Sequence, residues 1–292
     1  MDADDLHLNI DYVGSCGIVL TPEQKATLQT SLTILKHENG FTNVLFWGTI
    51  RGVSGDYFIA QGIGKDAITS RKTLYSKDCL VWGVLPVPGK SDIEKSKYFK
   101  ARFTGDPSYE AEFLNITQRP GEGDELVESE ELITMKEEDR LAAVIERIEN
   151  EVSIVPRGAY LRLASGQVVR NKSFEGILIS LTHITYLVAS GLTVAEASKA
   201  LSYFHFRPPI HLPHKPLADR AKLDKAIDFL DTIEDDNPNG CWAIQFERGS
   251  RLVLVKSLLW LGYVHYNLPG TNKYGAIYVG TGEYNIDLPF ML

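Results

Sequence analysis

The stretch FTNVLFWGTIRGVSGDYFIAQ, residues 41–61, decides the fold. Its first part, Phe41 to Arg51, is rich in β-branched and aromatic residues, and Asp56 to Gln61 has the same character. Between them, Gly52-Val-Ser-Gly55 has the composition of a turn. Two such runs around a turn predict a β-hairpin.

The C-terminal quarter repeats this pattern. Turn compositions at 247–250 and 269–272 separate short runs of strand-forming residues. Short sequential strands with tight connections are typical of an antiparallel meander. Four strands are expected there, at Cys241–Phe246, Arg251–Trp260, Tyr263–Tyr266 and Gly275–Val279. Residues 72–82 are expected to add further strands to the N-terminal hairpin.

Helical patterns lie mostly apart from these strands, at 22–37, 137–152 and 175–201, with a short helix expected near 217–230. The first begins with Thr21-Pro22-Glu23-Gln24, which offers a capping threonine, a proline at the first helical position and a capping-box glutamine. This segregation predicts an α+β fold, mainly antiparallel β-meanders with a few flanking amphipathic helices.

We expect a single domain over residues 1–292. Within it, two lobes are expected at 1–115 and 152–292, joined by an acidic loop-helix at 116–151.

The acidity of the chain is concentrated in one segment. The whole chain has a net charge of -8, and residues 121–151 hold 12 acidic and 3 basic side chains, a net of -9. The first part of this segment has a loop composition, and the second has the apolar stripe of a helix, through Leu141, Ile145 and Ile148. We expect this helix to place one face on the core and one in water. The alternative is a docking surface for a basic partner.

The composition excludes several classes of protein. Apolar residues make up 44%, enough for a sizeable core, and there is no excess of Lys or Arg to bind nucleic acid. The three cysteines, Cys16, Cys79 and Cys241, are far apart and predict a reducing compartment. The N-terminus lacks the pattern of a signal peptide, and we expect no membrane association.

No motif predicts catalysis, a cofactor or a metal site. Gly83 to Ser91 resembles a phosphate-binding loop, but it has one residue too many and two prolines that remove N–H donors. His205, His211 and His214 are expected on a proline-rich surface loop rather than around a metal. An enzyme with an unrecognised carboxylate or histidine site remains the alternative.

Aromatic residues are concentrated on or beside the predicted strands. Most should lie in the core, but Tyr and Trp are also enriched at protein interfaces. The residues predicted to contact a partner are Trp47, Tyr57, Tyr203, Phe204 and Trp260.

Several motifs together carry a resemblance to a known family. They run through most of the chain: Val44-Leu-Phe-Trp-Gly48, Asp56–Gly62, Arg71–Ser76, Gly105–Glu110, Pro156–Ala159, Ser202–Arg207, Arg251 through Leu258-Leu-Trp260, Tyr278–Glu283 and Asp287–Leu292. In this order they are similar to the radial spoke head protein 9 family. The resemblance implies a structural subunit of the radial spoke head in the axoneme of motile cilia and flagella.

The resemblance also implies partners and a role. They are the other spoke-head subunits and, through the head, the central pair apparatus, whose contact with the spokes regulates dynein-driven bending. It implies no catalytic residue and no cofactor.

One segment departs from the family pattern. Residues 177–191 are uncharged and rich in β-branched residues, and they separate two motifs that are nearly adjacent in the family. This segment is too short to span a membrane. We interpret it as an in-frame insertion from splicing or the gene model, and the alternative is a buried helix.

Overall fold

The computed structural model describes residues 1–120, 126–174, 177–178, 190–191 and 194–291, and the side chains of 1–115, 132–174 and 195–291. Its main element is an eight-stranded sheet in the order β13-β14-β15-β16-β1-β2-β3-β4. The strands from the first part of the chain are β1 (Asn43–Ile50), β2 (Tyr57–Ile63), β3 (Arg71–Ser76) and β4 (Gly83–Val84). Those from the last part are β13 (Trp242–Glu247), β14 (Leu252–Ser257), β15 (Tyr263–Asn267) and β16 (Tyr274–Gly280).

The pairing confirms the hairpin, the C-terminal meander and the α+β class. Neighbouring strands are antiparallel except at the centre, where β1 and β16 pair parallel, with Gly48 opposite Tyr278. The sequence did not predict this parallel pair. This pair joins strands from the two predicted lobes, residues 1–115 and 152–292, into one sheet.

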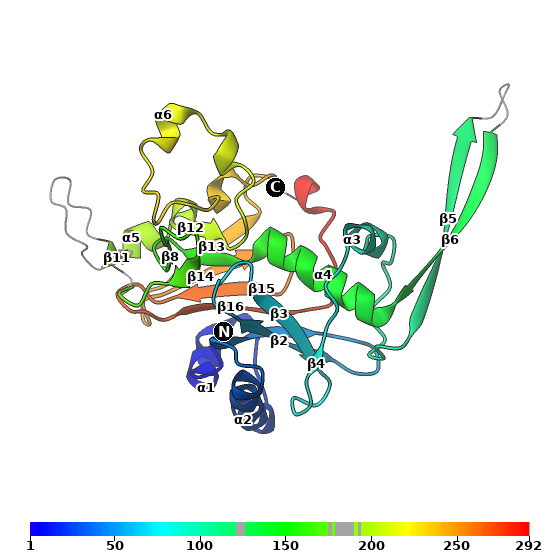
Figure 1. Cartoon of the computed structure of the whole chain (residues 1–292), viewed down its shortest axis with the longest axis horizontal. Helices are drawn as coiled ribbons and strands as arrows, with labels where there is room; N and C mark the ends of the chain where they lie inside the picture. Colours follow the sequence, from blue (N-terminus) through cyan, green and yellow to red (C-terminus); the bar gives the residue numbers. More distant parts are fainter. Residues whose placement is uncertain (121–125, 175–176, 179–189, 192–193, 292) are drawn as a thin grey trace.

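Both faces of the sheet are covered (Figure 1). Helix α4 (Glu137–Val152) lies on one face, and α1 (Leu6–Asn9) and α2 (Pro22–Glu38) lie on the other. Alternate residues of β2 supply the two cores: Tyr57 and Ile59 face the α4 side, whereas Phe58 and Ala60 face the α2 side. A strand buried on both faces is apolar throughout, which is why residues 41–61 show no polar alternation.

The capping prediction for α2 is confirmed. Thr21 Oγ1 accepts a hydrogen bond from the Gln24 N–H at 3.1 Å, and Gln24 Oε1 accepts one from the Thr21 N–H at 3.0 Å. These two bonds satisfy donors that the start of a helix leaves without partners.

The acidic segment is folded differently from the predicted loop-helix. Residues on either side of 121–125 form a long antiparallel hairpin, β5 (Glu110–Pro120) with β6 (Leu126–Lys136), which projects from the body (Figure 1). The helix α4 follows it directly, as predicted, and α3 (Lys90–Ser96) packs beside the base of the hairpin. The loop prediction is wrong for 126–136 because the backbone there pairs in antiparallel register with β5.

The remaining elements are short. They are β7 (Ile154–Pro156) paired with β12 (Tyr203–His205), β8 (Tyr160–Arg162) with β9 (Val168–Arg170), β10 (Ile177–Leu178) with β11 (Ser190–Gly191), α5 (Val194–Ala197) and α6 (Leu217–Arg220). Short 3₁₀ helices lie at Ile10–Cys16, Ala200–Ser202, Leu212–His214, Ile233–Asp235 and Leu288–Phe290.

Two helix predictions are confirmed only in part. The helix expected at 217–230 covers only Leu217–Arg220. In the range 175–201, α5 is the only described α-helix, and β10 and β11 are strands. Most of the interpreted insertion lies outside the described residues, so that interpretation stays a prediction. Among the described residues, no helix has the length and apolar character needed to cross a membrane.

Candidate functional site

The five aromatic residues predicted to contact a partner are all buried. Trp47, Tyr57, Tyr203, Phe204 and Trp260 are between 0% and 7% exposed. Four of them lie on strands and Trp260 lies in the turn between β14 and β15, and all five rings fill the cores between layers. The prediction of a contact surface at these residues is corrected: they stabilise the fold.

Three of the five bind the acidic helix instead. The side chains of Tyr57, Trp47 and Trp260 each donate a hydrogen bond to a glutamate of α4, and each bond is 2.7 Å long. The acceptors are Glu137, Glu149 and Glu151, in that order. The Phe-Trp-Gly and Leu-Leu-Trp motifs therefore hold α4 on the sheet.

Glu137, the first residue of α4, is the most enclosed of these carboxylates, at 2% exposure. Besides the Tyr57 hydroxyl, it accepts hydrogen bonds from the Thr104 N–H, the Thr104 hydroxyl and the Gly105 N–H, each at 2.8 Å. A buried carboxylate requires such compensation. Burial and the bond to Glu137 raise the pKa of Tyr57 well above its usual value, so the phenol stays protonated as a donor.

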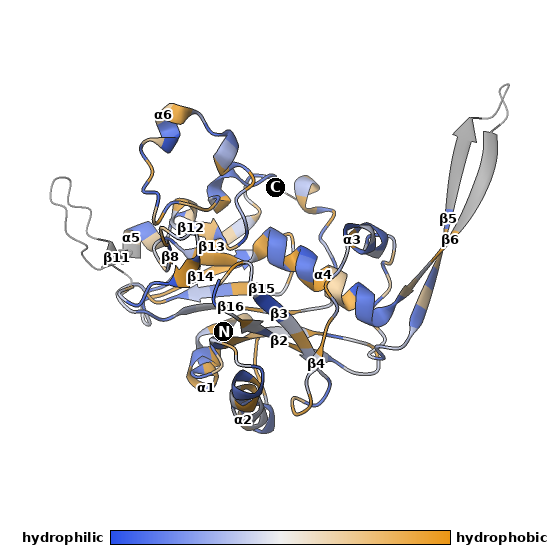
Figure 2. Cartoon of the chain, viewed as in Figure 1, coloured by the Kyte–Doolittle hydropathy of each residue, from blue (hydrophilic) through white to orange (hydrophobic). Residues whose placement is uncertain are grey.

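Helix α4 therefore does not simply place apolar residues on the core and charged residues in water, because three of its glutamates bind donors on the core side. Figure 2 shows hydrophobic and hydrophilic residues alternating along it. Sequence reasoning missed the inward carboxylates, although one signal was present. Glu137 lies four residues before Leu141, and Glu149 lies four after Ile145, so both continue the apolar stripe.

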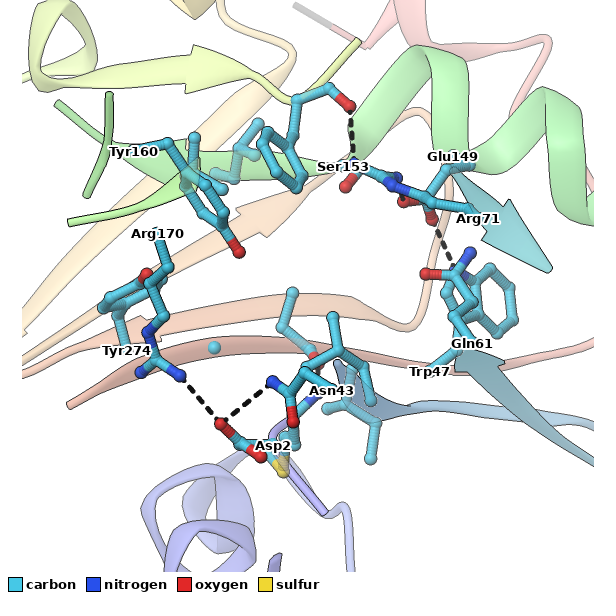
Figure 3. Close-up of a pocket in the computed structure, with 18 of the residues that line it drawn as sticks. Asp2, Asn43, Trp47, Gln61, Arg71, Glu149, Ser153, Tyr160, Arg170 and Tyr274 are labelled. Atoms are coloured by element: carbon cyan, nitrogen blue, oxygen red, sulfur yellow. Dashed lines mark hydrogen bonds and ion pairs between the residues drawn. The ribbon is translucent and has the colours of Figure 1, made fainter. Parts of the chain in front are cut away.

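A small cavity lined by both charged and apolar side chains lies between α4, the sheet and β9 (Figure 3). Its volume is about 80 Å³, well below the roughly 300–1,000 Å³ of small-molecule sites. Two ion pairs line it. Arg71 Nη1 lies 2.6 Å from Glu149 Oε1, and Arg170 Nη1 lies 2.8 Å from Asp2 Oδ2.

Two further polar groups of the cavity also form hydrogen bonds. Asn43 Nδ2 donates to Asp2 Oδ2 at 3.2 Å, and the Met1 amino group donates to the carbonyl oxygens of Phe46 and Ala276. Burial raises the pKa of Tyr160 and of Tyr274, which keeps both phenols neutral. The cavity therefore joins the N-terminus, the sheet and α4 through paired charges, and none of its acidic groups is free to act as a base.

The predicted histidine loop is corrected at one position. His205 is 2% exposed and lies in β12, where its Nε2 is 2.8 Å from Asp236 Oδ1. The same carboxylate accepts the Trp242 indole N–H at 2.7 Å. His211 and His214 are exposed, as predicted. Among the described residues, no three His, Cys, Asp or Glu side chains could hold a metal ion together.

Two exposed surfaces among the described residues are candidate contact sites for a partner. The first, the neutral face, consists of Ile34 on α2 and Leu80, Val81 and Val84 next to it, each at least 50% exposed. Residues 26–35 of α2 carry no charged side chain. Contiguous apolar surface of this kind is typical of protein contact sites.

The second surface is the open side of the β5–β6 hairpin near its base. Glu110, Glu112 and Leu114 on β5 are exposed, as are Leu132 and Thr134 on β6. We call these five residues the open hairpin face. Leu114 lies directly opposite Leu132 in the strand register.

Comparison with known proteins gives a full-length match. The chain is 44% identical over 292 residues to the radial spoke head protein 9 homolog of Homo sapiens, with 100% of both chains covered. It is 42% identical to that of Danio rerio and 40% identical to that of Xenopus tropicalis, each over 293 residues and the full length of both chains. No family model matches the sequence.

Proposed function

The chain belongs to the radial spoke head protein 9 family, and from this membership we propose that it is a structural, non-catalytic subunit of the radial spoke head. Its place is the axoneme of motile cilia and flagella. Its partners are the other spoke-head subunits. Through assembly of the head, it supports the contact with the central pair that regulates dynein-driven motility.

The observation that carries this proposal is the identity of 40–44% over the full length of the relatives. The polar groups support a structural role as well, because the carboxylates of α4 and the cavity bind neighbouring elements of the fold. The neutral face supplies an apolar surface suited to contact with another subunit. No feature of the cavity favours the alternative of an enzyme, since its charges are already paired.

Deletion of the gene tests the proposal. We expect cilia of normal length that beat abnormally, with density missing from the spoke heads in tomograms. Re-expression of the wild-type chain should restore both. Normal beating with complete spoke heads in the deletion strain would refute the proposal.

A matched pair of variants tests the neutral face. Leu80→Ser/Val81→Ser should reduce recovery of spoke heads, because it removes exposed apolar area without opening the core. Leu217→Ser/Ile210→Ser, which changes two comparably exposed residues on and near α6, is the control. Equal recovery of spoke heads with both variants would exclude the neutral face as a contact.

A further inference from the structure

The open hairpin face has the features of a docking surface with a defined partner chemistry. We propose that it binds a basic segment of another spoke-head subunit, with an apolar side chain of that segment packed on Leu114 and Leu132. The inference rests on the proposed function, because it takes the partner to be a spoke-head subunit.

The opposite face of the hairpin base is already occupied. Ile133 and Met135 are 8% and 7% exposed, and the Phe113 ring lies 5.6 Å from Tyr98 and 6.2 Å from Phe99. Successive side chains of a strand point to opposite faces. The contacts of one face therefore fix the base on the body and leave the other face directed outward.

Two leucines stand on that outward face. Leu114 is 47% exposed and Leu132 is 58% exposed, and they are direct cross-strand partners. Opposite residues of an antiparallel pair have Cβ atoms about 5 Å apart, so the two side chains form one apolar ridge. Such a ridge can receive one large apolar side chain.

The open hairpin face carries two carboxylates, Glu110 and Glu112, and the exposed Lys136 lies opposite Glu110 in the strand register. By sequence, residues 110–136 include 8 acidic and 2 basic side chains, a net of -6. In α4, by contrast, Glu137, Glu149 and Glu151 bind donors within the fold. Glu110 and Glu112 have no hydrogen bond or ion pair within the described part of the chain.

The carboxylates of Glu137, Glu149 and Glu151 in α4 serve the fold. Glu110 and Glu112, which precede the acidic segment 121–151, are free to attract a partner. Complementary charge speeds association and selects the partner. The apolar ridge adds affinity, because apolar side chains that pack on it lose their contact with water. A segment with Lys or Arg around one large apolar residue meets both requirements.

The binding experiment uses the full-length chain and the remaining spoke-head subunits, purified without it. Glu110→Lys/Glu112→Lys should raise the Kd about tenfold or more at low salt. Raising NaCl from about 50 mM to about 500 mM should weaken wild-type binding and have much less effect on this variant. Leu114→Thr/Leu132→Thr should also raise the Kd about tenfold but keep the salt dependence.

Matched controls show whether a loss of binding comes from the open hairpin face or from any change of surface charge or apolar area. Glu23→Lys/Glu234→Lys makes the same charge change at exposed positions outside both the hairpin and the neutral face. Leu261→Thr/Ile286→Thr changes two residues that are 60% and 61% exposed. Both controls should bind like the wild type, and thermal unfolding should show that every variant is folded.

The outcomes distinguish the two proposals. If the wild-type chain does not bind the other subunits, the proposed function fails. If the wild-type chain binds and the hairpin variants match their controls, only the docking inference is overturned. Zero-length carbodiimide cross-links from Glu110 or Glu112 to a partner lysine would support it directly.

Discussion

The hydroxyl of Tyr57 lies 2.7 Å from Oε1 of Glu137, so a residue in the middle layer of the protein binds the first residue of α4. The same carboxylate accepts bonds from Thr104 and Gly105. One buried charge thereby connects three segments: β2, the chain before the hairpin, and the helix after it.

Removing the Tyr57 hydroxyl should destabilise the fold without changing its shape. Tyr57→Phe leaves Glu137 with one donor fewer in a buried site. We expect the free energy of unfolding, measured with urea, to fall by about 1.5–3 kcal/mol, because the lost bond involves a charged acceptor. Tyr98→Phe, at a 42% exposed position, should change it by less than about 0.5 kcal/mol. Equal losses in the two variants would contradict this account of Glu137.

The ion pair of the cavity should show strong coupling. Arg71 and Glu149 are each 13% exposed, and the Trp47 indole binds the same carboxylate. Arg71→Met alone should cost about 3 kcal/mol, because it leaves a poorly solvated carboxylate without its cation. In a double-mutant cycle with Glu149→Gln, the double variant should lose about 1–3 kcal/mol less than the sum of the single variants.

A surface pair provides the reference for that cycle. Lys222 and Asp219 lie 3.1 Å apart with side chains 75% and 56% exposed. Their coupling should be at most about 0.5 kcal/mol, because water screens exposed charges. If the two cycles gave the same coupling, the cavity would not strengthen its ion pair.

Acid should destabilise the protein through His265. This residue is 0% exposed, and burial, with a smaller effect of the nearby N-terminal charge, lowers its pKa from 6.5 to about 3. Between these values the unfolded chain binds the proton and the folded chain does not. The contribution of His265 to stability is therefore complete above pH 6.5 and falls by up to about 1.4 kcal/mol per pH unit as the pH drops toward 3.

The variant His265→Phe isolates this contribution. Urea unfolding at several pH values between 7.5 and 4.5 should give a shallower loss for the variant than for the wild type. The Met1 amino group, whose pKa burial lowers from 8.0 to about 5, contributes a loss of the same sign to both proteins. Parallel curves for the two proteins would show that His265 is not the titrating group.

Gly48 should not tolerate a side chain. It has φ of +146°, and a Cβ atom there would lie 1.9 Å from the carbonyl oxygen of Tyr278. Gly48→Ala should lower the free energy of unfolding by about 3 kcal/mol, through backbone strain and displacement of β16. Gly249→Ala, which meets nothing within 4 Å, should change it by less than about 0.5 kcal/mol. A small effect at Gly48 would show that β1 and β16 separate easily.

Much of the fold could be predicted from local pattern. The capping box at Thr21 and the stripe through Leu141 identify α2 and α4 because they depend on residues within one or two turns. The hairpin of β1 and β2 is similarly local. The parallel pair of β1 and β16 could not be predicted, because no local sequence pattern shows which distant strand pairs with β1.

The candidate site was less predictable, for a related reason. Aromatic residues such as Trp47 and Trp260 suit both cores and interfaces, and only the packing of layers decides between them. The acidic residues were equally ambiguous, because a glutamate in a helix can face water or a buried donor. The loop predicted after residue 115 is wrong for 116–120 and 126–136, which belong to β5 and β6, because the acidic composition outweighs the weak alternation there.

The parallel pair of β1 and β16 has a consequence for how the protein is made. A ribosome releases β1, residues 43–50, long before it adds residues 274–280. During that interval one edge of a buried, apolar strand has no partner, and such edges promote aggregation. Pairing between the two ends of a chain is also slow to form. A cell that synthesises this protein must therefore shield an incomplete sheet until translation has nearly finished.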